Sequence, residues 1–285
     1  MTQTTSTGHT DTRPLVELLR KTHRAEWEAT PSSHDAISWL NDLVQFLFPS
    51  NHLPKNSSYE GILKKNQIDL ENILLSYLEP SGLDIVGVVS DFYNALEGIY
   101  QDLRLDASKI YEYDPAATSV NEVIVSYPGF YAITVYRIAN KLTQLNIPVL
   151  PRIVSEYAHG KTGVDIHPNA TIGVPFMIDH GTGIVIGETT IIGKNVSIYQ
   201  GVTLGALQVA KDLADIKRHP TVEDNVIIYA RTTILGGDTV IGRNSIIGGS
   251  VFLTKSIEPY SQVFNTHQLR ITPREIVVEP NNGSL

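Results

Sequence analysis

The sequence contains no cysteine, which excludes disulfides, cysteine-ligated zinc and thiol nucleophiles. It also lacks any apolar run as long as the roughly 18 to 20 residues of a membrane-spanning helix. Its polar N-terminus lacks the succession of basic, apolar and small residues that marks a signal peptide. Positive charge is scarce, since 22 Lys and Arg face 30 Asp and Glu and the net charge is -8. Nucleic acid and anionic membranes are therefore disfavoured as partners, and we expect a cytoplasmic location.

The first half of the chain has the periodicity of amphipathic helices. Residues 1–13 are rich in Thr and are expected to form a disordered tail, whereas residues 14–162 predict a helical domain. Ser32 and Ser33 are candidate N-caps of one helix. Further amphipathic stretches cover residues 59–78, 83–105, 131–145 and 152–159. A length of 285 residues leaves room for a second domain.

The second half repeats every six residues rather than every 3.6 or every two. Aliphatic residues mark each unit, with a two-residue slip after the third, a break after the seventh and one extra residue after the tenth: Ile166, Ile172, Ile178, Ile186, Ile192, Ile198, Leu204, Val222, Ile228, Ile234, Ile241, Ile247 and Leu253. A short fixed repeat is typical of a solenoid whose coils stack as parallel strands. Three hexapeptides would close one triangular coil, so we expect about four coils whose aliphatic residues form the core.

Together these patterns predict an α+β fold in which an all-helical domain precedes a left-handed parallel β-helix of hexapeptide repeats. The β-helix is expected over residues 163–260, with one extruded loop at residues 206–220, where the six-residue phase is lost. Residues 261–285 are expected to form a C-terminal tail. A scaffold of this kind carries many functions, so function has to be inferred from residues that depart from the repeat.

The strongest departure is the pair Asp179 and His180, which stands at a corner just before the slip. Asp165 precedes His180 by a little less than one coil, so the two side chains could meet at one edge, and an Asp beside a His fixes the imidazole tautomer. Arg218 and His219 end the extruded loop, where they could reach a ligand. Each residue also has a structural interpretation: a solvated corner His, an Asp that bonds its own turn, or a loop charge.

A zinc site built from His167, His180 and His219 is a further interpretation of the same residues. We favour it less, because the paired His spacing that such a site needs is missing and carboxylates offer other partners. We therefore expect no metal.

Several ordered motifs resemble the serine O-acetyltransferase family of hexapeptide acyltransferases. They are DIHP, IDHGTGIVIGET, IYQGVTLG and KRHP within the repeat, with YDPAA at residues 113–117 and GFYAITVYRIAN at residues 129–140 in the helical half. The family transfers acetyl from acetyl-CoA to the L-serine hydroxyl, which gives O-acetyl-L-serine on the route to cysteine. The resemblance thus implies an acyltransferase of cysteine biosynthesis.

The resemblance also implies roles for individual residues. His180 would be the general base and Asp165 would orient it. Asp114 and Asp179 would hold the serine ammonium, and Arg218 and His219 its carboxylate. The Gly205 N–H would steady the oxyanion, and Ala230 would line the CoA groove. The acetyl group would pass directly to serine in a ternary complex, without an acyl-enzyme.

Partners follow from the same resemblance. Acetyl-CoA would be a co-substrate and no cofactor would be permanently bound, while L-cysteine would be a feedback inhibitor. The family forms homotrimers or dimers of trimers, with active sites between adjacent β-helices. Many members insert a C-terminal Ile into O-acetylserine sulfhydrylase; this chain ends in Leu285. A changed branch point in a tight pocket costs about 1 kcal/mol or more, so we expect a weak complex or none.

The chain also departs from the family pattern. Its loop reads TLGALQVAKDLADIKRHP where a Gly-rich segment is common, Tyr131 stands where a His is often found, and a GVPAR-like segment is absent. These changes concern the CoA side and the C-terminus. Two alternatives stay open: an O-acetyltransferase for another hydroxyl acceptor, and a catalytically silent scaffold. Asp114 in its DPA segment disfavours a sugar acceptor, because a sugar needs no ammonium site.

Overall fold

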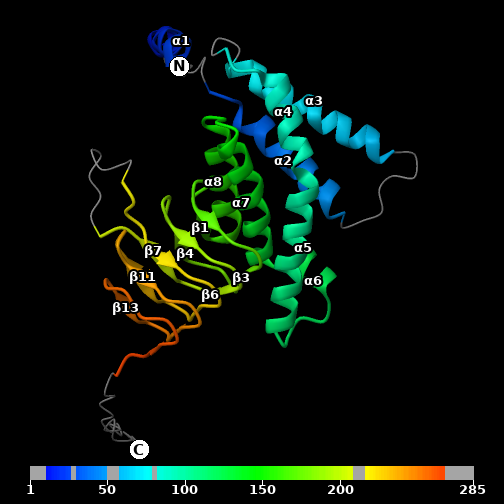
Figure 1. Ribbon diagram of the computed structural model, residues 1–285. Coiled ribbons are helices and arrows are strands. Elements are labelled where there is room, and N and C mark those ends of the chain that lie inside the picture. The colour runs from blue at the N-terminus through cyan, green and yellow to red at the C-terminus, as the bar shows by residue number, and fades with distance from the viewer. Residues whose placement is uncertain (1–10, 27–29, 50–57, 79–81, 208–215, 267–285) are drawn as a thin grey trace, which may run out of the picture.

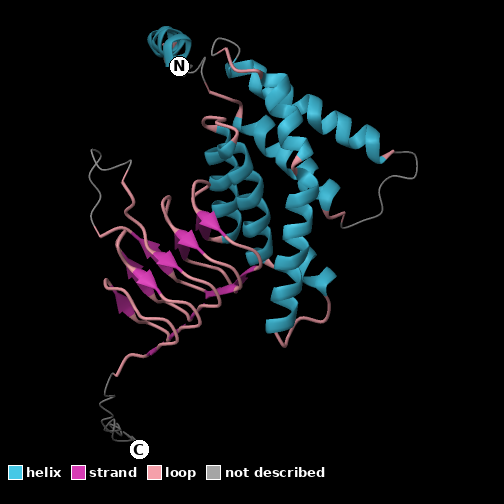
Figure 2. Cartoon of the chain, viewed as in Figure 1, coloured by secondary structure: helices cyan, strands magenta, loops and turns pink. Residues whose placement is uncertain are grey.

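Helices make up the first part of the molecule and short strands the second (Figures 1 and 2). The computed structural model describes residues 11–26, 30–49, 58–78, 82–207 and 216–266. The helices are α1 (Arg13–Glu26), α2 (Ser33–Leu47), α3 (Tyr59–Leu78), α4 (Ile85–Asn94), α5 (Leu96–Tyr113), α6 (Val120–Ser126), α7 (Pro128–Gln144) and α8 (Leu150–Thr162). Within the described ranges, no helix is both long and apolar enough to cross a membrane.

Two of the expected helices begin where the sequence indicates, and a third is divided. Ser32 caps α2, because its side-chain oxygen accepts the Asp35 N–H at 3.3 Å, and α3 spans the expected residues 59–78. The single helix expected over residues 83–105 is instead two, α4 and α5. The Ala95 N–H donates to the Phe92 carbonyl oxygen three residues back, at 3.1 Å. That tightened turn ends α4 before α5 starts.

Helix α6 is an element that the sequence analysis missed. Ser119 accepts the Glu122 N–H at 3.1 Å, and the Glu122 carboxylate accepts the Thr118 N–H at 2.6 Å. This is a variant of the capping box, in which the Glu carboxylate binds the residue before the N-cap instead of the N-cap itself. The Ser and Glu three residues apart are the signal that could have predicted the helix.

The second part is a parallel β-solenoid with three sheets, one on each face. Its strands are β1 (Val164–Ile166), β2 (Thr171–Ile172), β3 (Phe176–Asp179), β4 (Ile184–Ile186), β5 (Ile191–Ile192), β6 (Val196–Tyr199), β7 (Thr203–Gly205), β8 (Thr221–Val222), β9 (Ile227–Ile228), β10 (Thr233–Leu235), β11 (Val240–Ile241), β12 (Ile246–Ile247), β13 (Phe252–Leu253) and β14 (Gln262–Val263). The first sheet has the order β1-β4-β7-β10-β13, the second β2-β5-β8-β11 and the third β3-β6-β9-β12-β14.

The six-residue repeat is confirmed as the ladder inside the solenoid. Ile166 pairs in register with Ile186, and Ile186 pairs with Leu204; these side chains are buried. Two sheets have five strands, so the solenoid is longer than the four coils expected. The extra strand is β14, which pairs with β12 beyond the expected end at residue 260. The predicted α+β architecture is therefore correct, but the predicted number of coils was too low.

Helix α7 joins the two parts, because it is buried on two sides. Phe130 and Ile133 belong to a hydrophobic cluster that continues into the solenoid interior. Ile138 and Leu142 belong to a second cluster shared with α2, α3, α4 and α8. Helices α5, α7 and α8 consequently cover the β1–β3 end of the solenoid (Figure 1). That end of the core is shielded by helices rather than by another coil.

A buried ion pair ties this junction together. Two guanidinium nitrogens of Arg137 on α7, Nε and Nη2, donate to the Asp106 carboxylate on α5, at 2.6 and 2.9 Å. Asp106 is fully buried, and its Oδ1 also accepts the Phe176 N–H at the start of β3, at 2.8 Å. One carboxylate thus links two helices and the strand that leads to His180.

We expect Asp106→Asn to destabilise the protein by about 3 to 5 kcal/mol, because it leaves the buried Arg137 charge without its counter-ion. Denaturant unfolding at fixed protein concentration measures this loss. The matched control is Glu156→Gln on α8, whose ion pair with Arg152 is exposed and worth about 1 kcal/mol or less. Equal losses in the two variants would contradict a role for the buried pair.

Candidate active site

The residues singled out in the sequence stand at two different edges of the first sheet. The His180 edge is formed by the turns that lead into this sheet, at residues 180–183, 200–202, 229–232 and 248–251. The Arg218 edge is formed by the turns that leave it, at residues 167–170, 187–190, 206–220 and 236–239. A three-residue strand separates the edges, which is about 10 Å of extended chain.

A hollow of about 390 Å³ lies at the His180 edge. It brings together three of the predicted residues, Asp114, Asp179 and His180. The complete lining is Asp114, Ser126, Tyr127, Pro128, Gly129, Ile178, Asp179 and His180. Residues from the end of α5, the start of α7 and the end of β3 therefore converge on one cavity.

His180 occupies a corner that forces its side chain outward. Its φ is 57°, a left-handed conformation that costs a non-glycine residue of order 1 kcal/mol. The imidazole is 69% exposed, and its Nδ1 lies 3.8 Å from Asp179 Oδ1. The corner thus presents an accessible ring nitrogen among the residues that line the hollow.

Asp114 is held as a fixed carboxylate. The Tyr127 hydroxyl donates to its Oδ2 at 2.6 Å, and the Ala116 N–H donates to its Oδ1 at 2.8 Å. The Tyr127 hydrogen bond, followed by the Ala116 one, lowers the pKa of the Asp114 carboxyl below its usual range. Asp114 thus faces the hollow as an anion, suited to a cationic group.

A close contact of α7 with β3 shapes the same hollow. A Cβ added at Gly129 would lie 2.5 Å from the Ile178 carbonyl oxygen, a distance that only glycine avoids. The first turn of α7 therefore sits directly against the strand end that carries Asp179 and His180.

The Arg218 edge holds a second polar group. Arg218 pairs with Glu188, and the buried His219 ring accepts the Thr189 N–H on Nδ1 at 3.1 Å. Burial, followed by the Arg218 charge, lowers the pKa of His219 to about 4. Because a backbone N–H can only donate, the neutral ring carries its proton on Nε2 and presents a donor there.

Two residues of this group, Glu188 and Thr189, were missed in the sequence. They lie within the IGET segment of the family resemblance, at residues 186–189. The Thr189 hydroxyl oxygen also accepts the backbone N–H groups of Arg218 and His219, at 2.9 and 3.0 Å. It anchors the end of the loop, whose residues 208–215 lie outside the described residues.

Asp165 belongs to a strand, whereas His180 belongs to a corner. Asp165 lies at the middle of β1, beside Val185 of the next coil, and its charge acts on His167. No hydrogen bond or ion pair joins Asp165 to His180 in the described part of the chain. Their predicted partnership stays a prediction.

The three histidines of the zinc interpretation also divide between the edges, since His167 and His219 lie at the Arg218 edge. His167 is half-buried, and burial followed by the Arg152 charge lowers its pKa. Over residues 11–26, 30–49, 58–78, 82–207 and 216–266, no three His, Asp or Glu side chains gather in a group that could hold a metal ion.

The two remaining predicted residues also lie at different edges. Gly205 ends β7 at the Arg218 edge, and its carbonyl oxygen accepts the Gly236 N–H at 3.1 Å. Ala230 lies at the His180 edge, and its carbonyl oxygen accepts the Ser250 N–H at 2.9 Å. Each edge thus carries one of the two residues predicted for the acetyl-CoA side of the site.

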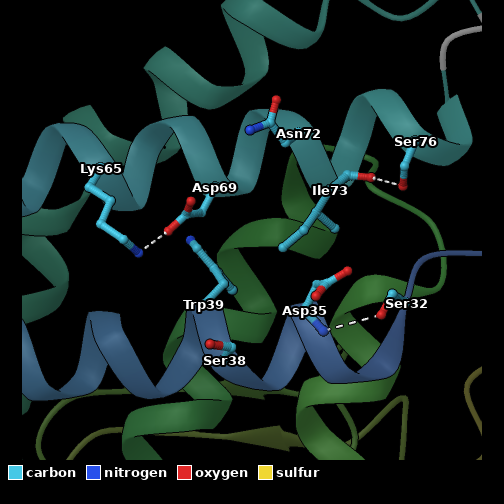
Figure 3. A pocket seen from close by; sticks show the side chains of 9 residues that line it. All are labelled: Ser32, Asp35, Ser38, Trp39, Lys65, Asp69, Asn72, Ile73 and Ser76. Carbon is cyan, nitrogen blue, oxygen red and sulfur yellow. Dashed lines mark hydrogen bonds and ion pairs between the residues drawn. The ribbon is translucent and has the colours of Figure 1, made fainter.

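A separate hollow of about 280 Å³ opens between α2 and α3 (Figure 3). Its most prominent cation, Lys65, already donates to Asp69 at 2.6 Å and to Asp42 at 3.3 Å. None of the residues predicted from the sequence lines it. Its lysine is already paired with carboxylates, so it lacks the convergent groups of the His180 hollow.

The stacked six-residue units place the chain in the class of hexapeptide-repeat solenoids. No protein-family model matches the chain. The chain is 49% identical over 184 residues to a plasmid serine acetyltransferase of Synechococcus elongatus, covering 63% of this chain and 57% of that relative. It is 44% identical over 154 residues to the serine acetyltransferase of Bacillus subtilis, covering 54% and 69%.

Solved structures agree with these relatives. Serine acetyltransferase 1 of Entamoeba histolytica, in complex with L-cysteine, matches with a TM-score of 0.72 and 34% identity over 79% of this chain and 86% of that one. A serine acetyltransferase in complex with CoA matches with a TM-score of 0.57 and 28% identity, over 81% and 92%. The chain belongs to the serine acetyltransferase family and is an acyltransferase.

We expect Gly187→Ala to displace the His219 ring, because a Cβ at Gly187 would lie 2.0 Å from its Cδ2. The folded pKa of His219, about 4, lies below the ordinary value of 6.5. The unfolded chain therefore binds more protons between these values, and His219 makes stability fall as the pH falls through that window. This loss should shrink in Gly187→Ala.

Denaturant unfolding at pH 7.5 and pH 5 measures the difference. Gly160→Ala is the control, because nothing lies within 4 Å of its added Cβ. An unchanged pH dependence in Gly187→Ala would show that His219 keeps its place.

Proposed function

We propose that the protein transfers an acetyl group from acetyl-CoA to the L-serine hydroxyl, giving O-acetyl-L-serine and free CoA. The observation that carries the proposal is the hollow in which Asp114, Asp179 and His180 converge, in a chain whose relatives are named serine acetyltransferases. A carboxylate pair for an ammonium beside a base for a hydroxyl matches the two reactive ends of serine.

His180 acts as the general base in this proposal. It takes the proton of the serine hydroxyl as the oxygen attacks the thioester carbon; collapse of the tetrahedral intermediate breaks the carbon–sulfur bond, and the thiolate leaves to be protonated. Asp165 orients His180, as the resemblance implies. The Gly205 N–H donates to the oxyanion, and Ala230 lines the CoA groove. Acetyl-CoA is a co-substrate, and no permanent cofactor takes part.

The amino-acid end of serine is held by opposite charges. Asp114 and Asp179 bind its ammonium, whereas Arg218 and the Nε2–H donor of His219 bind its carboxylate. These groups stand at different edges of the first sheet, separated by its strands. One serine cannot reach both within a single chain, because about 10 Å of strand alone intervenes.

The two halves meet when the His180 edge of one chain faces the Arg218 edge of the next. Such a heterologous contact closes into a ring, and a three-sided solenoid suits a homotrimer. Each active site then belongs to two chains. A dimer of trimers through the helical part is the larger assembly that the family resemblance implies.

Two other expectations concern partners and location. Residues 267–285, which include the terminal Leu285, lie outside the described residues, so the expected weak or absent complex with O-acetylserine sulfhydrylase stays a prediction. The cytoplasmic location and the boundaries of the domains and tails also stay predictions from the sequence.

A panel of hydroxyl acceptors tests the function. Acetyl-CoA is incubated with L-serine, L-threonine, L-homoserine or a sugar, and the thiol released is measured. Serine should give the highest kcat/KM. A higher value for another acceptor, or no turnover with any, would overturn the proposal.

We expect His180→Ala to lower kcat roughly 10²- to 10⁴-fold, the usual contribution of a positioned general base. The fold should persist, because the exposed imidazole makes little core contact. Asp165→Asn should cost less. Steady-state thiol release measures both, and near-normal turnover of His180→Ala would eliminate it as the base.

L-Cysteine should compete with serine, because it has the same ammonium and carboxylate. The Entamoeba histolytica relative was solved in complex with L-cysteine. Arg218→Ala should raise the KM for serine and the Ki for cysteine together, roughly ten-fold or more, by removing a charge-assisted hydrogen bond. Inhibition kinetics measure both constants. A variant that changes only one of them would place the two ligands at different sites.

A further inference from the structure

Tyr127 is a residue of the His180 hollow to which neither the sequence nor the family resemblance gives a role. It is the N-cap residue of α7 and is half-buried. Its hydroxyl donates to Asp114 Oδ2 at 2.6 Å. The same side chain lines the hollow beside Asp179 and His180.

The charges of the pair are well defined. The hydrogen bond to Asp114 is the main cause that raises the pKa of Tyr127 to about 12, so the phenol keeps its proton at neutral pH. The same bond is the main cause that lowers the pKa of Asp114. A neutral donor thus faces an ionised acceptor, which is the stronger kind of hydrogen bond.

The position of Tyr127 is fixed by the backbone that follows it. Gly129, two residues later, packs against the Ile178 carbonyl oxygen so closely that an added Cβ would lie 2.5 Å away. Ile178 precedes Asp179 and His180 on the same strand end. Tyr127 is therefore anchored to the element that carries the proposed base.

Asp114 lies in the turn after α5, and its backbone N–H donates to the Ile110 carbonyl oxygen of that helix at 3.0 Å. The other hydrogen bond to its carboxylate comes from the Ala116 N–H in the same turn. Among the described residues, the Tyr127 hydroxyl makes the one side-chain hydrogen bond from this turn to the start of α7. Without it, the position of Asp114 relative to His180 would depend on the turn alone.

We propose that Tyr127 is a positioning residue that orients Asp114 to receive the ammonium of the acceptor amino acid. This inference rests on the proposed function, because it describes how the same site recognises serine. An oriented carboxylate loses less conformational entropy when the ligand binds. The contribution of Tyr127 should therefore appear in the binding of acceptors that carry an ammonium.

The test is Tyr127→Phe, which removes only the hydroxyl. We expect the KM for serine to rise roughly ten-fold, as for a lost hydrogen bond to a charged group, with kcat within about two-fold and the KM for acetyl-CoA unchanged. The matched control is Tyr131→Phe in the same helix, whose buried hydroxyl has no hydrogen-bond partner in the described part of the chain. It should leave the serine KM unchanged.

Two comparisons separate positioning from general structural support. In an Asp114→Ala background, Tyr127→Phe should have no further effect on the serine KM, because the two residues act as a unit. With 3-hydroxypropionate, which is serine without its amino group, Tyr127→Phe should match the unmodified protein. An equal loss in either comparison would overturn the inference.

The inference and the proposed function fail in different ways. If the unmodified protein does not acetylate serine, the function fails and the inference with it. If serine is acetylated and Tyr127→Phe has the same serine KM as the unmodified protein, only the inference is wrong.

Discussion

The in-register stacking of aliphatic residues in successive coils is the interaction on which the rest of the structure depends. Each buried Ile or Leu of one coil lies over its counterpart in the next, as Ile186 lies between Ile166 and Leu204. This register sets where every turn falls. The positions of His180 and Arg218 at opposite edges follow from it, because an edge is the place where the chain leaves one ladder for another. His180 and Arg218, the residues of the proposed site, thus stand at corners, while the ladder provides stability through burial.

Helix α7 fixes the helical part against the solenoid. Its two buried faces belong to different cores, its Arg137 pairs with Asp106, and its start carries Tyr127 against the end of β3. The hollow beside His180 consequently depends on how the helices cover the solenoid, although its proposed base belongs to the solenoid. This explains how a residue of the turn after α5, Asp114, comes to face a residue of the solenoid 66 positions later in the chain.

Much of the fold could be predicted because its cause is local. The spacing of Ile172, Ile192 and similar residues is a direct consequence of coil geometry. Ser32 caps α2 through a hydrogen bond from Asp35, only three residues later in the sequence. The contacts that were missed are not visible in local pattern. Tyr127 can bind Asp114 because the intervening turn and α6 fold back and bring the two residues together. Thr189 binds His219 because the two residues lie on neighbouring coils. The predicted meeting of Asp165 with His180 rests on coil length and on the family resemblance, neither of which gives the direction of a side chain, so it stays a prediction.

The central claim is that each active site combines the His180 edge of one chain with the Arg218 edge of another. Co-expression of His180→Ala with Arg218→Ala, assayed at subsaturating serine, tests it most directly. In randomly mixed rings, one interface in four pairs an intact His180 with an intact Arg218, so activity should return to about a quarter of that of the unmodified protein. Arg218→Ala alone should stay at about a tenth or less, in keeping with its higher KM, and His180→Ala alone should stay lower still. Mixed assemblies with no more activity than the two variants measured separately would contradict the claim and place the whole site within one chain.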